Sequence, residues 1–235
     1  MPGYLTKQER IAIVGADDLI IRSLLDREQY ADPLGEAERI GISSSMWPLF
    51  GMIWPSGLHL AARIAARGLT PGERVLEIGC GLALASLVAH RHGADVTASD
   101  CHPLTAGFLK ANLRLNGLSS LKYRNGNWNN PVAPVARNGH SRLRTVVGEY
   151  DFIIGSDVLY ERDEGAALSG FIARHASAAA EVWIVDPDRA NRATFNRQMA
   201  ALGFGVTESR MDQPAVGTGL PYKGRLLMYV RSRLK

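Results

Sequence analysis

The sequence is poor in the residues that cross-link small secreted proteins or bind structural metals. Only two cysteines occur, Cys80 and Cys101, and the six histidines show no ligand spacing with thiols or carboxylates. A disulfide framework and a metal site are therefore not expected, and we interpret both thiols as reduced. No apolar run approaches the roughly 20 residues that cross a bilayer, and the opening MPGYLTKQER lacks the apolar stretch of a secretory signal. These absences predict a cytoplasmic protein that does not act in a membrane.

A strong charge of one sign is also absent. The chain has 27 Lys and Arg against 23 Asp and Glu, a net charge of +4 over 235 residues. Such a mild excess permits a nucleic-acid partner without requiring one. The length suits one well-buried α/β domain and is short for two ordinary ones.

Strand-like apolar runs and segments with helical spacing alternate from residue 74 onward. The last two strand candidates follow one another without a helix, which predicts an antiparallel hairpin, whereas the earlier alternation favours parallel pairing. The expected fold is α/β, with a doubly wound, Rossmann-like and mostly parallel seven-stranded sheet in three α-β-α layers. Strands are expected at 75–79, 94–100, 121–125, 150–157, 181–186, 204–210 and 225–231, and helices at 82–92, 103–116, 165–179 and 190–202.

The first 55 residues do not follow this alternation. They contain a possible helix near 17–30 and then a segment rich in Pro, Gly and aromatic residues. We interpret residues 1–55 as an N-terminal extension packed on a domain at 56–235. Trp47 and Trp54 either form a wall of the active site or attach the extension to the core.

The segment VLEIGCGLALAS, residues 75–86, places two glycines between an expected strand and an expected helix. Gly79 and Gly81 allow positive φ and a close approach of the backbone to a ligand. The helix that follows directs free amides and its positive dipole end toward the same place. Alone, this pattern is equally typical of a structural turn. Leu84 stands where a dinucleotide-binding motif has its third glycine, which argues against NAD.

Two carboxylates accompany this turn. Glu77 lies two residues before Gly79 and suits a cationic ligand, and Asp100 ends the next expected strand, where an acidic residue can hold ribose hydroxyls. We expect Asp100 to face a cleft and to contribute little to packing. Glu77-x-Gly79-x-Gly81 followed by Asp100 resembles the seven-strand S-adenosylmethionine-dependent methyltransferases, over about residues 55–231. This resemblance implies S-adenosylmethionine as cofactor, with the turn at its methionine part and Asp100 at its ribose.

The same resemblance implies further cofactor contacts. Asn127 and Trp128 follow the third strand and would flank the adenine, with asparagine where an aspartate is common. Trp128 is equally well interpreted as a core residue. The remaining candidates for cofactor contacts are Trp54, Cys80 and Ser156.

The segment SDVLY, residues 156–160, ends the fourth expected strand and bears on the methyl acceptor. Enzymes of the superfamily that methylate amino groups of nucleic acids carry Asn or Asp, two prolines and an aromatic residue there, and this chain has neither proline. The run from Asp157 to Tyr160 resembles instead the Asp-x-x-Tyr motif of a lysine-directed branch, whose members modify chaperones and the electron-transfer flavoprotein β subunit. The segments 51–61 and 186–189 resemble the same branch.

The resemblance implies methyl transfer to a protein side chain, most simply a lysine amine. Asp157 would orient the amine or accept its proton, and Tyr160 would hydrogen-bond it or form a wall that prefers a cation. A structural alternative is that Asp157 caps the following helix and Tyr160 only packs. Functional alternatives are a small-molecule or RNA methyltransferase on the same fold, with nucleic acid less favoured, or a catalytically silent cofactor-binding module. The irregular loop at 129–148 is longer than the pattern expects, which leaves room for a different substrate.

Overall fold

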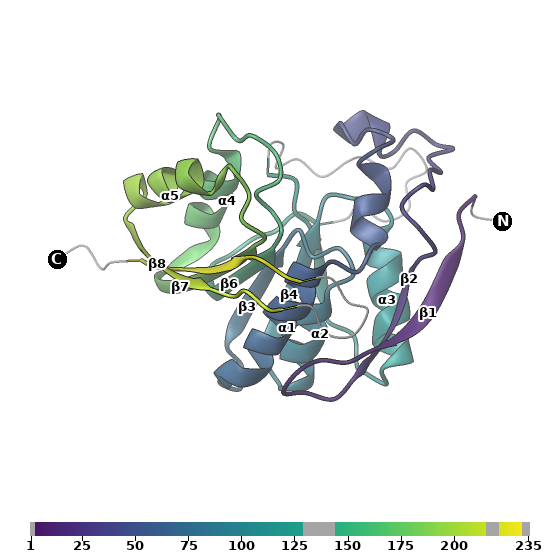
Figure 1. Ribbon diagram of the computed structural model, residues 1–235, viewed down its shortest axis with the longest axis horizontal. Helices are drawn as coiled ribbons and strands as arrows, with labels where there is room; N and C mark the ends of the chain where they lie inside the picture. Colours follow the sequence, from purple (N-terminus) through teal and green to yellow (C-terminus); the bar gives the residue numbers. More distant parts are fainter. Residues whose placement is uncertain (1–2, 129–143, 215–220, 232–235) are drawn as a thin grey trace.

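The computed structural model describes residues 3–128, 144–214 and 221–231, so most of the loop expected at 129–148 lies outside the described residues. A seven-stranded sheet has the strand order β5-β4-β3-β6-β7-β9-β8, with β7, β9 and β8 antiparallel and the other neighbours parallel (Figure 1). This confirms the mostly parallel sheet with an antiparallel C-terminal hairpin. The strands are β3 (Arg74–Ile78), β4 (Asp95–Asp100), β5 (Lys122–Asn125), β6 (Tyr150–Ser156), β7 (Ala176–Asp186), β8 (Phe204–Arg210) and β9 (Arg225–Arg231).

Helices cover both faces of this sheet. In Figure 1, α4 and α5 lie on one side, and α1, α2 and α3 lie on the other. The core is divided accordingly, because Phe152 and Ile154 of β6 belong to one buried cluster and Ile153 to a second. Within the described residues, no helix is long and apolar enough to cross a membrane. The helices are α1 (Pro55–Arg67), α2 (Leu84–Arg91), α3 (Thr105–Leu115), α4 (Ala167–His175) and α5 (Arg192–Ala201).

The helix expected near 17–30 is wrong, because this segment contributes a strand. β1 (Thr6–Ile11) and β2 (Leu19–Leu24) form an antiparallel two-stranded sheet beside α3 (Figure 1). Two asparagines one helical turn apart, one in α3 and one directly after its last residue, bind the backbone of β2. The side-chain oxygens of Asn112 and Asn116 accept the amides of Arg22 and Ile20 at 2.8 and 2.9 Å. Tertiary partners for an otherwise open strand edge thus override a weak helical pattern.

The helix expected at 165–179 is too long at its C-terminal end. α4 ends at His175, and β7 begins with Ala176 and runs through an alanine-rich segment that favours helix by propensity. The guanidinium of Arg231 donates to the carbonyls of Ala173 and Ala176 at 2.8 and 2.7 Å. These bonds satisfy carbonyls at the helix end and stabilise the turn into the sheet.

Trp47 attaches the N-terminal extension to the core. It lies in the 3-10 helix η2 (Trp47–Gly51), is 1% exposed, and its ring contacts the rings of Tyr4, Tyr30, Phe50 and His102. Of the two interpretations that the sequence left open for this tryptophan, the structure supports attachment. Trp54 differs, because it precedes α1 and borders a cavity described below.

Candidate active site

The turn after β3 has the backbone conformation expected for its glycines. Gly79 and Gly81 have φ of 58° and 49°, which is the left-handed region that glycine adopts without a steric penalty. A Cβ on Gly81 would lie 2.9 Å from the Phe50 carbonyl oxygen, and a Cβ on Gly79 would lie 3.0 Å from Val158 Cγ1. The close approach that excludes larger residues therefore involves the protein's own extension and the segment after β6.

Glu77 is buried beneath this turn, with 3% of its surface exposed. Its Oε2 accepts the backbone amide of Ser86 in the first turn of α2 at 2.9 Å. Burial raises the pKa of Glu77 to about 7, while the bonds from Ser86 oppose this shift and the nearby Asp100 adds to it. The carboxyl group is therefore poised to ionise near neutral pH, particularly if a cation binds next to it.

We expect Glu77 to make the ligand-free protein less stable as the pH rises. The folded-state pKa lies above the usual 4.5, so folding takes up a proton between about pH 4.5 and 7, and stability present at low pH is lost across this window. Relative to Glu77→Gln, the unfolding free energy of the wild type should fall by on the order of 3 kcal/mol, at about 1.4 kcal/mol per pKa unit.

Urea unfolding at several pH values measures this difference. The exposed Glu36→Gln serves as the control for a simple change in net charge. Wild type and Glu77→Gln with parallel pH profiles would contradict the assignment of a raised pKa to Glu77.

Asp100 is buried and accepts backbone hydrogen bonds, whereas the sequence suggested a side chain that only faces a cleft. It is 8% exposed; its Oδ2 accepts the amide of Gly81 at 2.9 Å and its Oδ1 accepts the amide of His102 at 2.8 Å. Burial raises its pKa, and the backbone bonds counteract this shift. The expectation that Asp100 contributes little to the fold is therefore wrong, because its side chain joins the end of β4 to the glycine turn.

One cavity of about 510 Å³ lies where β3, β4 and β6 end. Its volume is within the roughly 300–1,000 Å³ typical of small-molecule sites. It opens beside β3 and β6, where the sheet order reverses direction along the chain and where ligands bind in open α/β sheets. All eleven residues proposed from the sequence line this cavity: Trp54, Glu77, Gly79, Cys80, Gly81, Asp100, Asn127, Trp128, Ser156, Asp157 and Tyr160.

Asp157 does not cap the helix that follows it. The first amides of α4, from Ala167 and Leu168, bind the carboxylate of Asp163 at 2.8 Å each. Asp157 instead accepts two bonds from Arg189, Nε to Oδ1 at 2.8 Å and Nη2 to Oδ2 at 3.0 Å. The capping alternative is therefore excluded, and the carboxylate is oriented by a bidentate ion pair at the cavity wall.

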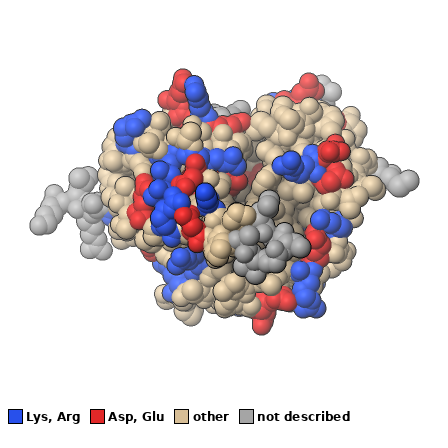
Figure 2. Space-filling view, viewed as in Figure 1, with Lys and Arg blue, Asp and Glu red and all other residues tan. Residues whose placement is uncertain are grey.

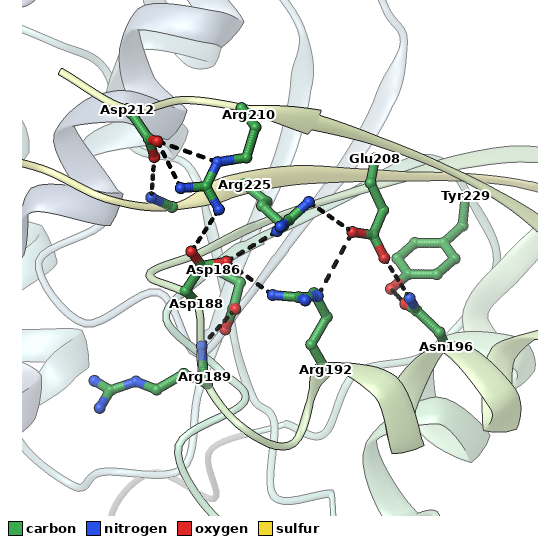
Figure 3. Close-up of polar contacts among 11 residues, drawn as sticks. Asp186, Asp188, Arg189, Arg192, Asn196, Glu208, Arg210, Asp212, Arg225 and Tyr229 are labelled. Atoms are coloured by element: carbon green, nitrogen blue, oxygen red, sulfur yellow. Dashed lines mark hydrogen bonds and ion pairs between the residues drawn. The ribbon is translucent and has the colours of Figure 1, made fainter.

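Arg189 is itself held by a tight turn after β7, shown in Figure 3. Its backbone amide donates to Asp186 Oδ2 at 2.8 Å, and Asp186 is fully buried. The next carboxylate, Asp188, has a φ of 58° and is bound by three guanidinium groups, from Arg192, Arg210 and Arg225. This network fixes the turn from which Arg189 reaches Asp157.

The sequence reasoning missed several residues that line the same cavity. Arg189 belongs to a segment that was noticed, but its pairing with Asp157 joins residues 32 positions apart. His102 stacks on Phe50 with ring centroids 3.8 Å apart, and burial lowers its pKa to about 3, so it is neutral. Glu161 follows Tyr160 directly and lines the cavity as well. In the sequence, Glu161 was signalled by its position beside the motif and Arg189 by its place in the segment 186–189, whereas His102 had no signal.

Tyr160 and the two cavity tryptophans differ in their surroundings. Tyr160 is 44% exposed, which argues against the interpretation that it only packs in the core. The indole N–H of Trp54 donates to the Leu49 carbonyl at 2.9 Å and so fixes this ring as part of the wall. The indole N–H of Trp128 is buried and has no hydrogen-bond partner among the described residues.

Comparison with known proteins places this geometry in a family. A family model described as lysine methyltransferase matches residues 48–198. The electron transfer flavoprotein beta subunit lysine methyltransferase of Xenopus laevis is 27% identical over 146 residues, which are 61% of this chain and 54% of that protein. Histone-arginine methyltransferase METTL23 of Rattus norvegicus is 31% identical over 120 residues, 49% of each chain. The chain spans about half the length of these curated relatives.

Solved structures confirm the fold. Magnesium protoporphyrin IX methyltransferase from Synechocystis PCC 6803, with bound SAM, has a TM-score of 0.56 at 19% identity, covering 75% of this chain and 78% of that one. Ribosomal protein L11 methylase from Lactobacillus delbrueckii subsp. bulgaricus has a TM-score of 0.53 at 17% identity, covering 77% and 81%. At these identities the likeness concerns the fold alone. The family model, however, covers more than half of the chain, including the glycine turn and the segment from Asp157 to Tyr160. The chain therefore belongs to the lysine methyltransferase family.

Proposed function

We propose that this chain transfers a methyl group from S-adenosylmethionine to the side-chain amine of a lysine in a protein. The observation that carries the proposal is the single cavity into which the glycine turn, Asp100 and the Asp157–Arg189 pair all project. Membership of the lysine methyltransferase family supports the reaction class. Two relatives support the acceptor, the electron transfer flavoprotein beta subunit lysine methyltransferase of Xenopus laevis and the protein N-lysine methyltransferase METTL21A of Xenopus tropicalis.

The residues of the cavity fit the proposed cofactor. Glu77 offers a buried carboxyl group that a cation would ionise. Asp100, which accepts backbone bonds from Gly81, His102 and Cys101, keeps one acceptor site for a hydroxyl group. Leu84 lines the cavity at the start of α2, where a pyrophosphate would need space, so NAD fits poorly. We assign Glu77, Gly79, Cys80 and Gly81 to the methionine part, Asp100 to the ribose, Asn127 and Trp128 to the adenine, and Trp54 and Ser156 to the adjoining wall.

On the acceptor side, we assign catalytic roles to Asp157 and Tyr160. When bound, S-adenosylmethionine supplies a methyl group already activated by a sulfonium, so the protein mainly positions the acceptor and removes its proton. A lysine ammonium, with a reference pKa near 10.4, must lose one proton before its nitrogen can form the new bond to carbon. Asp157, kept in one orientation by Arg189, would bind the amine and assist this loss. The hydroxyl of Tyr160 is protonated at neutral pH, because its pKa, ordinarily 10.0, is raised further by partial burial and by the charge of Glu161, so it can act as a donor.

Nucleic acid is the less favoured acceptor. Figure 2 shows basic and acidic side chains lying against each other over α5 and the β8–β9 hairpin. On that face they do not separate into a purely basic patch. Arg210 and Arg225, for example, are both paired with carboxylates. A nucleic-acid site would need phosphate-binding cations that are not already neutralised.

The class of acceptor can be tested by labelling. Purified protein is incubated with tritiated S-adenosylmethionine and cell lysate, and the products are treated with protease or nuclease. We expect acid-precipitable label that protease releases and nuclease does not. Label released by nuclease would contradict a protein acceptor, label found only in small molecules would favour the small-molecule alternative, and cofactor binding without any transfer would indicate a silent module.

A further inference from the structure

A second cavity of about 430 Å³ adjoins the first. Four residues line both cavities, namely Trp128, Val158, Tyr160 and Glu161. The rest of the second cavity is formed by the segment between β6 and α4, by the first turn of α4, and by α5 with the two residues before it. Its volume exceeds that of one side chain and lies within the range of ligand sites. None of the proposed cofactor contacts other than Trp128 lines it.

The charge at the junction comes from Glu161. Both oxygens of Asp157 are bound by the guanidinium of Arg189, so the charge of that carboxylate is largely balanced. In the described part of the chain, the side chain of Glu161 forms no ion pair of 4.0 Å or less. Burial raises the pKa of Tyr160 and of Cys101, and the charge of Glu161, which lines the same cavity, adds to both shifts. A carboxylate that has no ion-pair partner in the part of the chain that the structure describes, and that lies beside an aromatic ring, suits a cationic side chain.

The wall that carries Glu161 is held in place from α5 and its N-terminus. The side-chain Nδ2 of Asn191 donates to the backbone carbonyls of Leu159 and Glu161, at 2.9 Å each. Gln198 donates to the carbonyl of Asp163 at 2.7 Å, and the carboxylate of Asp163 caps α4. The segment between β6 and α4 is thereby pre-organised on both sides of Glu161, as expected of a binding wall.

We propose that the acceptor lysine reaches the active site through the second cavity, between Trp128 and Tyr160, and that Glu161 binds its ammonium group at the junction. This inference rests on the proposed function and assigns the charge selection to Glu161, whereas Asp157 serves the transfer itself. Glu161 thus attracts the cationic side chain, whereas Asp157 binds the amine that receives the methyl group.

Binding of a lysine side-chain analogue tests this inference without any methyl transfer. The protein, saturated with S-adenosylhomocysteine at low salt, is titrated with n-butylammonium chloride or with 1-butanol, a neutral analogue of the same chain length. The indole N–H signal of Trp128 is followed by NMR and assigned through Trp128→Phe. We expect n-butylammonium to shift this signal at concentrations at which 1-butanol does not.

The variants Glu161→Gln and Glu149→Gln are compared in the same titration. Glu149 is exposed and lies just before β6, at the opposite end of this strand from the cavity. Glu161→Gln should weaken n-butylammonium binding about two- to fivefold, the range for a partly exposed ion pair, and Glu149→Gln should not change it. Equal shifts with both analogues, or unchanged affinity in Glu161→Gln, would overturn the inference.

The kinetics of the labelled acceptor protein give a second readout. Glu161→Gln should raise the KM for the acceptor with little change in kcat, whereas a change in kcat alone would contradict a role in acceptor binding. Failure of the underlying function is distinguishable, because it would abolish protein labelling in the wild type while the n-butylammonium titration could still be measured.

Discussion

Replacing Asp157 by asparagine is expected to lower the kcat for methyl transfer by at least about 100-fold, the usual contribution of a positioned acid–base group. The substitution keeps the backbone, because Asp157 has a φ of 52° and asparagine tolerates this conformation as well as aspartate does. It removes the charge and one of the two acceptors for Arg189. Affinity for S-adenosylhomocysteine should stay within about twofold, because we assign Asp157 to the acceptor side.

The chain supplies a matched control for this experiment. Asp151, near the start of β6, forms a similar bidentate pair with Arg74, at 2.7 and 2.9 Å, far from the cavity. Asp151→Asn therefore removes an aspartate–arginine pair at the other end of β6 without touching the site. Each substitution should lower the free energy of unfolding by at most about 1 kcal/mol, because these pairs are partly exposed. Near-normal kcat in Asp157→Asn would contradict the catalytic role of Asp157.

Replacing Asp100 by alanine is expected to affect both cofactor binding and folding. Loss of the hydrogen bond that a ribose hydroxyl would donate to this carboxylate should weaken binding of S-adenosylhomocysteine by about 1.5–3 kcal/mol, or roughly 10- to 150-fold. The amides of Gly81 and His102 would lose their acceptor, so the free energy of unfolding should also fall, by about 2–4 kcal/mol.

Calorimetry well below the unfolding temperature and urea unfolding separate these two effects. Asp95→Asn is the control, since Asp95 begins β4 at the end far from the cavity and pairs with Lys122 on the surface. Unchanged affinity in folded Asp100→Ala would refute the ribose assignment, and an unchanged unfolding free energy would refute the structural role.

The sheet could be predicted from the sequence because its central strands are buried on both faces and read as short apolar runs between glycines. The two wrong assignments have tertiary causes. β2 is extended because Asn112 of α3 and Asn116 just after it bind its edge. α4 stops early because Arg231 binds one carbonyl in its last turn and the carbonyl of Ala176 just after it. Neither contact leaves a local pattern, since the partners lie far apart in the chain.

The parts of the candidate site that could be predicted are those in which a short sequence motif at the end of one strand contains the functional side chains or glycines. Gly79, Gly81 and Asp157 were found in this way, although their surroundings were not. Gly81 lies against the carbonyl of Phe50 in the extension, and Asp157 is bound by Arg189 from the next strand end along the sheet. Contacts between strand ends depend on sheet order, which the sequence specifies only indirectly.

The cytoplasmic location stays a prediction.

The identity of the methylated residue tests the central claim most directly. One relative is named for arginine methylation of histones and two others for lysine methylation, so the acceptor atom is the deciding point. The protein labelled from tritiated S-adenosylmethionine is hydrolysed to amino acids, and the label is identified by chromatography against methylated standards. We predict label in Nε-methylated lysine that disappears when Asp157→Asn replaces the wild type. Label in methylarginine, or in no amino acid at all, would contradict a lysine-directed protein methyltransferase.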